Sequence, residues 1–167
     1  MLRDKMTTSD LKTNEIEPGA ESADVIVRGR GDGFAQEIIS GKHHLRADEP
    51  VSLGGTDTGA TPYDFLLAAL GSCTSMTIAF YARRKHWPLD HVVVRLRHSR
   101  IYARDCAECE TKEWMLDQIE RAIEIAGPLT DAQRSALMAI ADKCPVHRTL
   151  RSEIRITTRP LTTVAPN

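Results

Sequence analysis

The four cysteines of this chain, Cys73, Cys106, Cys109 and Cys144, are the side chains best suited to redox chemistry. A cysteine reacts as its thiolate, whose formation depends on burial and on nearby positive charge. Two separated cysteines can act as a peroxidatic and a resolving pair. One thiolate attacks an O–O bond and becomes a sulfenic acid, and the other condenses with it to form a disulfide that external thiols reduce.

Cys73 and Cys144 differ in their surroundings in the sequence. Cys73 lies in the apolar stretch 65–82, where a free cysteine is a common core residue. Cys144 opens the run Cys-Pro-Val-His-Arg, so His147 and Arg148 are cationic neighbours that can stabilise a thiolate. Cys73 by itself indicates a core residue, whereas the presence of Cys144 makes a redox pair the better interpretation.

Cys106 and Cys109 form a Cys-x-x-Cys pair with three interpretations. A structural zinc site needs four ligands, and the sequence offers these two cysteines, His98 on the preceding strand as a third, and no evident fourth. A redox-active pair is the second interpretation, because Cys109 precedes a helix capped by Thr111, whose backbone N–H groups favour a thiolate. Inert surface thiols are the third.

The elements that must position these cysteines begin with a three-stranded β-meander. Residues 25–28, 34–39 and 43–47 are rich in strand-forming side chains, and glycine-containing turns separate them. The following loop, 53–60, holds three glycines, which allow close backbone approach or positive φ.

A long central helix is predicted for residues 61–85. Thr61 is its N-cap, Pro62 takes its first position, and Asp64 completes a variant of the capping box. Apolar residues cover all its faces, so we expect it to be buried all round. One chain offers too little sheet to wrap such a helix, which predicts a homodimer. The polar run 71–77 argues against a membrane span.

Two further strands and two further helices complete the predicted fold. The strands alternate in hydrophobicity, and the helices have apolar stripes and N-terminal caps at Thr111 and Thr130. The strands are expected at 90–103 and 153–158, and the helices at 111–126 and from Thr130 to the Cys144–Pro145 step. The order βββ-α-β-α-α-β is typical of the α+β class.

Length and charge exclude several classes of protein. The 167 residues suit one domain, expected over residues 23–159, with flexible tails at 1–22 and 160–167. Lys+Arg 22 and Asp+Glu 23 leave a net charge of −1, so neither nucleic acid nor a membrane is an expected partner. The polar N-terminus lacks a secretory signal, which predicts the cytoplasm. Without a phosphate-binding glycine loop, no nucleotide cofactor is expected.

Three motifs of the chain occur together in a recognisable order. They are Gly54-Gly-x-x-x-Gly59-x-x-Pro62, Asp64-Phe-Leu-Leu-Ala-Ala-Leu-Gly-Ser-Cys73-Thr-Ser-Met-Thr77 and Asp142-Lys-Cys144-Pro145-Val146-His147. With them, residues 24–158 resemble the OsmC/Ohr family of hydroperoxide-detoxifying thiol peroxidases, which serve the oxidative stress response. The resemblance implies an OsmC/Ohr-like fold in an intertwined homodimer, with two long helices at the centre wrapped by sheets from both chains.

The resemblance also implies roles for particular residues. Cys73 matches the peroxidatic position and Cys144 the resolving position. The best-studied branch of the family uses an arginine near its N-terminal strands to activate the peroxidatic thiolate. Arg30 matches that arginine, or Arg28 if the register is shifted by two. The glutamate that this branch has after the helix-opening proline is replaced here by Tyr63.

Two functions follow as hypotheses. The first is a thiol-dependent peroxidase that reduces organic hydroperoxides, in which Cys73 attacks, Arg30 holds its thiolate, Cys144 resolves, and a dithiol reductant completes the cycle. The alternative is an OsmC-like protein that is not a peroxidase and binds a hydrophobic ligand or, through Cys106 and Cys109, a metal.

Overall fold

The computed structural model describes residues 24–102 and 115–161 of the chain. The expected tail at 1–22 and the Cys106–Cys109 pair lie outside the described residues. The chain divides into two compact units, Met1–Ala60 and Thr61–Asn167, which are treated separately below. The expectation of one domain over 23–159 stays a prediction.

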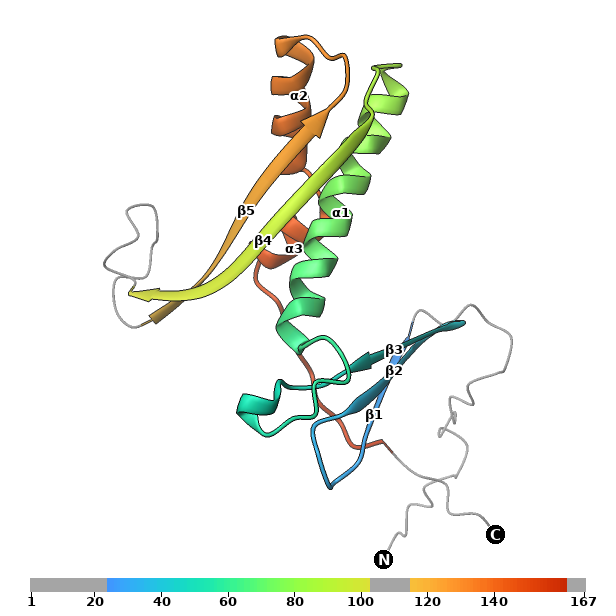
Figure 1. Cartoon of the computed structure of the whole chain (residues 1–167), viewed down its shortest axis with the longest axis vertical. Helices are drawn as coiled ribbons and strands as arrows, with labels where there is room; N and C mark the ends of the chain where they lie inside the picture. Colours follow the sequence, from blue (N-terminus) through green and yellow to red (C-terminus); the bar gives the residue numbers. More distant parts are fainter. Residues whose placement is uncertain (1–23, 103–114, 162–167) are drawn as a thin grey trace, which may run out of the picture. The chain divides into compact units, whose positions relative to one another are not determined.

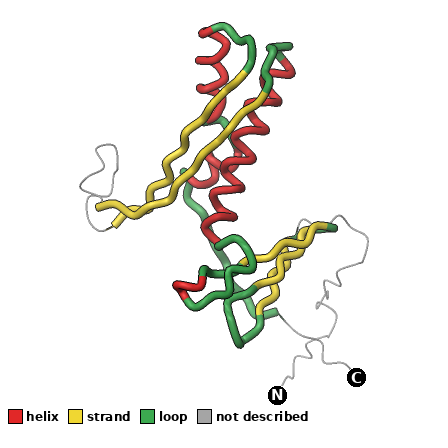
Figure 2. The backbone as a smooth tube through the Cα atoms, viewed as in Figure 1, coloured by secondary structure: helices red, strands yellow, loops and turns green. Residues whose placement is uncertain are grey.

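The first unit contains the predicted meander (Figures 1 and 2). Its antiparallel strands are β1 (Val25–Gly29), β2 (Gln36–Ser40) and β3 (His43–Ala47), in the order β1-β2-β3. Val27 pairs with Ile38, and Ile38 pairs with Leu45. Such branched aliphatic side chains suit neighbouring positions on a pleated surface. The prediction of a three-stranded meander is confirmed.

A buried carboxylate organises the loop after β3. Asp48 is 2% exposed, and its oxygens accept hydrogen bonds from the hydroxyl and backbone N–H of both Thr56 and Thr58 and from the N–H of Glu49. The Thr56 hydroxyl contributes most to holding the pKa of Asp48 well below its usual range. A carboxylate with this many donors is favoured in its charged form.

The glycines of this loop have the roles expected of them. Gly54 adopts φ 88°, which is in the left-handed region that side chains disfavour. A Cβ at Gly55 would overlap the carbonyl of Glu49, and a Cβ at Gly59 would overlap that of Arg46. Close backbone packing therefore requires glycine at the last two positions.

The second unit begins with the central helix α1 (Pro62–Arg84), which starts as predicted and ends one residue early. The Thr61 hydroxyl accepts from the N–H of Asp64 at 3.2 Å, and the Asp64 carboxylate accepts from the N–H of Thr61 at 2.9 Å. This complete capping box satisfies N–H groups that the first helical turn leaves unpaired.

Helix α1 is buried along one face in the single chain. The buried side chains of this face recur every fourth residue: Leu70, Thr74, Ile78 and Ala82. Met76 and Phe80, which point elsewhere, are 70% and 53% exposed. As expected from the limited sheet of one chain, a single copy leaves part of this apolar helix uncovered. Burial of its remaining faces by a second copy stays a prediction.

A long hairpin packs against α1 (Figure 1). Its antiparallel strands β4 (His91–Tyr102) and β5 (Met115–Ala126) pair over twelve residues each. The strand predicted at 90–103 is confirmed, but the helix predicted at 111–126 is wrong over its described part. Apolar residues of β5 fit both a helical stripe and alternation, and pairing along the whole of β4 selects the strand.

Two helices follow the hairpin. Helix α2 (Asp131–Ala141) begins with the predicted capping box of Thr130 and Gln133. Helix α3 (Pro145–Leu150) was not expected, and Cys144 is its N-cap. A six-residue helix is too short to show a hydrophobic period in sequence.

The strand predicted at 153–158 is absent from the described chain. Ile154 and Ile156 are 53% and 85% exposed. A strand needs a neighbour for its backbone hydrogen bonds, and neither described sheet pairs with this segment.

The core of the second unit joins α1, β5 and α2. Its buried members are Ile78, Ala82, Ile125, Leu137 and Ala141. Although α1 is long and apolar enough to cross a membrane, it is the core helix of this fold. The packing of α2 on α1 brings the chain after Ala141 to the middle of α1, where Cys73 lies.

Candidate functional site

The second unit brings Cys73 and Cys144 together. Their thiols lie close enough to interact with each other, although one lies in the middle of α1 and the other at the start of α3. Both thiols are free. Cys144 is completely buried, whereas Cys73 is partly exposed. A reagent from solution therefore reaches Cys73 more readily than Cys144.

The surroundings of Cys144 favour its thiolate. Burial opposes the charge, but hydrogen bonds from Cys73, the His147 N–H, the Thr74 hydroxyl and the Val146 N–H together lower the pKa of the Cys144 thiol. Two of these donors belong to the first turn of α3, where unpaired N–H groups point toward the N-cap. The buried sulfur thus has several donors ready for its charged form.

The surroundings of Cys73 disfavour its thiolate. Burial and the adjacent Cys144 raise the pKa of the Cys73 thiol, and hydrogen bonds from the Val146 N–H and the Thr77 hydroxyl offset this only in part. In the reduced pair, Cys73 is therefore the thiol that donates and Cys144 is the sulfur that accepts.

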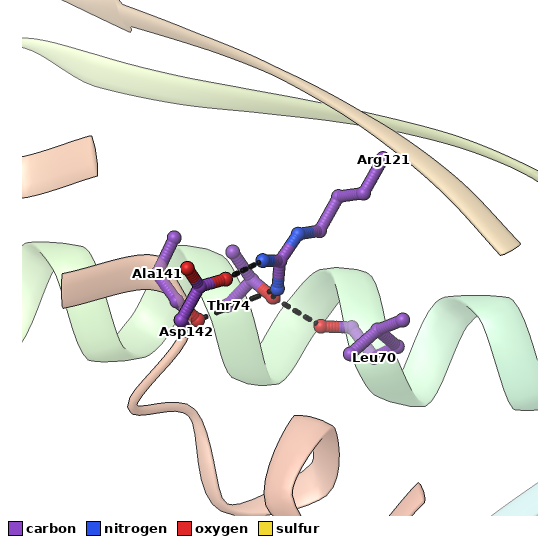
Figure 3. Close-up of polar contacts among 5 residues, drawn as sticks. All are labelled: Leu70, Thr74, Arg121, Ala141 and Asp142. Atoms are coloured by element: carbon purple, nitrogen blue, oxygen red, sulfur yellow. Dashed lines mark hydrogen bonds and ion pairs between the residues drawn. The ribbon is translucent and has the colours of Figure 1, made fainter. Parts of the chain in front are cut away.

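A largely buried arginine, Arg121, contacts Thr74, the residue that follows Cys73 (Figure 3). Nη1 of Arg121, on β5, donates to Thr74 Oγ1 at 3.0 Å and to the carbonyl of Ala141 at 3.3 Å. Its Nη2 donates to Asp142 Oδ1 at 2.6 Å. The Arg121 side chain is 12% exposed, whereas that of Asp142 is 68% exposed. Arg121 therefore ties the residue next to Cys73 to the end of α2.

Sequence reasoning missed Arg121. The sequence does contain a signal for it: Arg121 occupies one of the alternating positions whose other members are Ile119, Ile123 and Ile125. A strand places these four side chains on one face. Because a helix was predicted for this segment, Arg121 was not expected to lie on a face with the isoleucines.

Arg30 lies in the first unit, where it is exposed and forms an ion pair with Asp32 at 3.6 Å. Arg28, Arg30 and Arg46 line a hollow of about 260 Å³ on the first sheet. The role of Arg30 toward Cys73 stays a prediction.

Tyr63 and His98 contact each other in the second unit. Their rings are stacked with centroids 4.3 Å apart, and Nε2 of His98 lies 2.9 Å from Asp117 Oδ1. Position 63 thus packs on the hairpin. The zinc interpretation needs His98 together with Cys106 and Cys109, and these two cysteines lie outside the described residues.

Comparison with known folds places the chain among structures of one kind. It aligns with an OsmC-like protein from Mycoplasma pneumoniae at 21% identity and TM-score 0.60, covering 77% of this chain and 86% of that one. For the organic hydroperoxide resistance protein OsmC from Legionella pneumophila, identity is 22%, TM-score 0.55, and coverage 77% and 89%. For OhrB of Bacillus subtilis, also an organic hydroperoxide resistance protein, identity is 19%, TM-score 0.53, and coverage 77% and 89%.

These alignments establish the α+β OsmC-like fold, with its three-stranded N-terminal sheet, long central helix, β-hairpin and following helices. No curated protein sequence matches the chain. The family model of OsmC-like proteins matches residues 55–159, which include Cys73, Arg121 and Cys144. The chain belongs to the OsmC-like protein family.

Proposed function

We propose that this protein is a thiol-dependent peroxidase that reduces organic hydroperoxides. The observation that carries the proposal is the contact between a partly exposed thiol, Cys73, and a completely buried one, Cys144. A peroxidatic cysteine must be reachable by substrate, and a resolving cysteine must be adjacent to it. Family membership and the structural likeness to hydroperoxide resistance proteins support the same chemistry.

The reaction begins with attack by Cys73 on the terminal oxygen of the hydroperoxide. The O–O bond breaks, Cys73 becomes a sulfenic acid, and an alkoxide leaves. The thiol proton of Cys73 passes to the Cys144 thiolate and then to the alkoxide, which departs as an alcohol. Cys144 is well placed to accept this proton because its pKa is the lowered one of the pair.

The second step closes the disulfide. The Cys144 thiolate attacks the sulfur of the Cys73 sulfenic acid, the S–O bond breaks, and hydroxide leaves and takes a proton from solvent. A dithiol reductant then exchanges with the Cys73–Cys144 disulfide, which returns both thiols while the reductant becomes a disulfide.

Arg30 completes the proposed site by supplying positive charge. Burial raises the pKa of Cys73, and a guanidinium beside its sulfur would favour the thiolate at the moment of attack. Arg28 takes this part if the register is shifted by two. Substitution of each arginine by alanine distinguishes the two, since only the activating one slows the oxidation of Cys73.

We also propose that the working form is a cytoplasmic homodimer. The exposed apolar side chains Met76 and Phe80 of α1 are the surface that a second copy would cover. Sedimentation of the full chain at micromolar concentration is expected to give a dimer, and a stable folded monomer would overturn this part of the proposal.

The function is tested by hydroperoxide consumption with dithiothreitol as the dithiol. The wild-type protein should consume cumene hydroperoxide catalytically. Cys73→Ser should abolish the reaction, and Cys144→Ser should allow about one equivalent to be consumed before turnover stops, because the sulfenic acid is then left unresolved.

Mass spectrometry of the treated wild-type protein should find a Cys73–Cys144 disulfide. An unreactive Cys73 with no hydroperoxide consumption would refute the peroxidase assignment. Catalysis that survives Cys73→Ser and is lost in Cys144→Ser would reverse the two roles.

A further inference from the structure

The contacts of Arg121 reach both sides of the cysteine pair. Thr74 follows Cys73 on α1, and Ala141 and Asp142 end the helix that leads to Cys144. One guanidinium bonds to all three residues (Figure 3). A side chain from a third element, β5, therefore contacts the residue after Cys73 and the end of the helix that leads to Cys144.

Thr74 carries this connection to the sulfur. Its side chain is completely buried, and its hydroxyl is within hydrogen-bonding reach of both the Leu70 carbonyl, at 2.7 Å, and the Cys144 sulfur. The hydroxyl has one proton for these two acceptors. A guanidinium can only donate hydrogen bonds, so Thr74 Oγ1 accepts from Arg121. The Thr74 hydroxyl proton is then available for either the Leu70 carbonyl or the Cys144 sulfur.

Accepting from Arg121 makes the Thr74 hydroxyl a stronger donor, because hydrogen bonds in a chain polarise one another. The strongest acceptor within reach is a Cys144 thiolate. In the structure, in which both thiols are free, the proton goes to the Leu70 carbonyl at 2.7 Å. Ionisation of Cys144 would offer the hydroxyl a stronger acceptor, and disulfide formation would return its proton to Leu70. The buried hydroxyl thus has an acceptor in both redox states.

We propose that Arg121 is a positioning residue for the Cys73–Cys144 pair, acting through Thr74 to stabilise the Cys144 thiolate. This inference rests on the proposed function for its biological meaning. Its effect on the pair is measurable without any hydroperoxide.

The charged and titratable side chains around Cys144 come from four elements. They are Cys73 on α1, Arg121 on β5, Asp142 at the end of α2 and His147 on α3. Asp142 is 68% exposed and pairs with Arg121, so its charge is largely shared with solvent. Variants at Arg121 must therefore be compared with Asp142→Asn, which removes the carboxylate and keeps the contacts to Thr74 and Ala141.

The experiment measures two properties in the reduced full-length protein. The first is the pH midpoint of thiolate absorbance, taken as the difference between each variant and its Cys144→Ser counterpart. The second is the equilibrium constant of the Cys73–Cys144 disulfide against glutathione. Because a stabilised thiolate favours the reduced pair, Arg121→Gln should raise the pH midpoint and increase the equilibrium constant for disulfide formation about fivefold.

Thr74 gives the matched variants. Thr74→Ser keeps the hydroxyl and should behave as wild type, while Thr74→Val should reproduce the effect of Arg121→Gln. The double variant should be no worse than either single one, because both substitutions break the same chain of hydrogen bonds. Arg121→Lys, which keeps a donor but loses the fork, should lie between wild type and Arg121→Gln.

Arg134 is the control for a purely structural arginine. It lies on α2 and donates to the carbonyls of Ile125 and Gly127, away from the cysteines. Arg134→Gln should lower stability and leave the pH midpoint and the disulfide equilibrium unchanged. If Arg121→Gln behaves in the same way, or if its effect adds fully to that of Thr74→Val, the proposal is overturned.

The failure of this inference is distinguishable from failure of the proposed function. A wild-type protein that consumes no hydroperoxide refutes the peroxidase, but the pH midpoint and the glutathione equilibrium still report on Arg121. Conversely, an active peroxidase whose cysteine pair ignores Arg121 refutes only the positioning role.

Discussion

The Tyr63 ring lies on the imidazole of His98, with ring centroids 4.3 Å apart and planes inclined by 19°. Tyr63 belongs to the first turn of α1 and His98 to β4, and Asp117 Oδ1 of β5 lies 2.9 Å from Nε2 at the edge of the imidazole. Three elements therefore meet at this stack. The residue at position 63 fastens the start of the central helix to the hairpin.

This stack predicts different outcomes for two substitutions of Tyr63. Tyr63→Phe keeps the ring and should leave the free energy of unfolding unchanged. Tyr63→Ala removes the stacked pair and should lower it by about 1 kcal/mol. Urea unfolding monitored by circular dichroism measures both. Equal losses in the two variants would mean that the hydroxyl, and not the ring, is what matters.

The two capping boxes predict a matched pair of losses. Thr61→Ala and Thr130→Ala each remove a hydroxyl that accepts from a backbone N–H of the first helical turn. Each should cost about 1 kcal/mol of stability, whereas the Thr→Ser variants should stay near wild type. Denaturant titration checks this, and an unaffected Thr61→Ala protein would show that the α1 box contributes nothing.

The loop glycines predict a contrast between Gly59→Ala and Gly33→Ala. A Cβ at Gly59 meets the backbone of Arg46, whereas a Cβ at Gly33 meets nothing within 4 Å. Gly59→Ala should therefore lower the melting temperature clearly, and Gly33→Ala should not. Thermal unfolding of the two full-length variants provides the test, and equal melting temperatures would contradict the close packing of this loop.

Asp48 predicts an acid-dependent loss of stability. Its hydrogen bonds, that of the Thr56 hydroxyl first, lower its pKa in the folded chain. The unfolded chain therefore binds this proton more readily. The resulting stabilisation is complete above the unfolded-state pKa and is lost as the pH falls toward the lower folded-state pKa.

The wild-type protein should therefore have a higher free energy of unfolding than Asp48→Asn at neutral pH, and this difference should disappear between about pH 5 and about pH 2. Unfolding midpoints measured across this range check the sign. Asp32→Asn, at an exposed carboxylate, is the control and should show no such trend. An advantage that stays constant into acid would show that charge on Asp48 is not the stabilising feature.

Local chemistry explains which parts of the fold were predictable. Capping residues, glycine turns and the meander are encoded within a few residues of each other, so the starts of α1 and α2 and the strands β1 to β3 were found from sequence. β5 was not, because its residues fit two periods and only its pairing with β4 decides between them. Helix α3 was not predicted for a similar reason. It is short, and its packing on α1, not a local sequence pattern, favours the helical conformation.

The candidate site divides in the same way. Cys73 and Cys144 could be predicted as partners because motifs surround them. Arg121 has no motif, and its importance follows from a contact with Thr74 across 47 residues. A contact of this kind depends on tertiary packing, which single-sequence periodicity does not encode.

The pairing register of β4 and β5 determines whether Arg121 faces the helix that carries Cys73. Arg121 stands opposite Leu96, and Ile123 and Ile125 share its face and pack on the core. Because side chains alternate along a strand, a slip by one residue would turn Arg121 away from α1 and bury Glu120 or Ala122 in its place. A slip by two would keep the face and carry the guanidinium about 7 Å along the strand. The contact between Arg121 and Thr74 therefore depends on the number of residues between Met115 and Arg121 as well as on their identity. A single-residue insertion there would turn Arg121 away from Thr74 even though no cysteine had been changed.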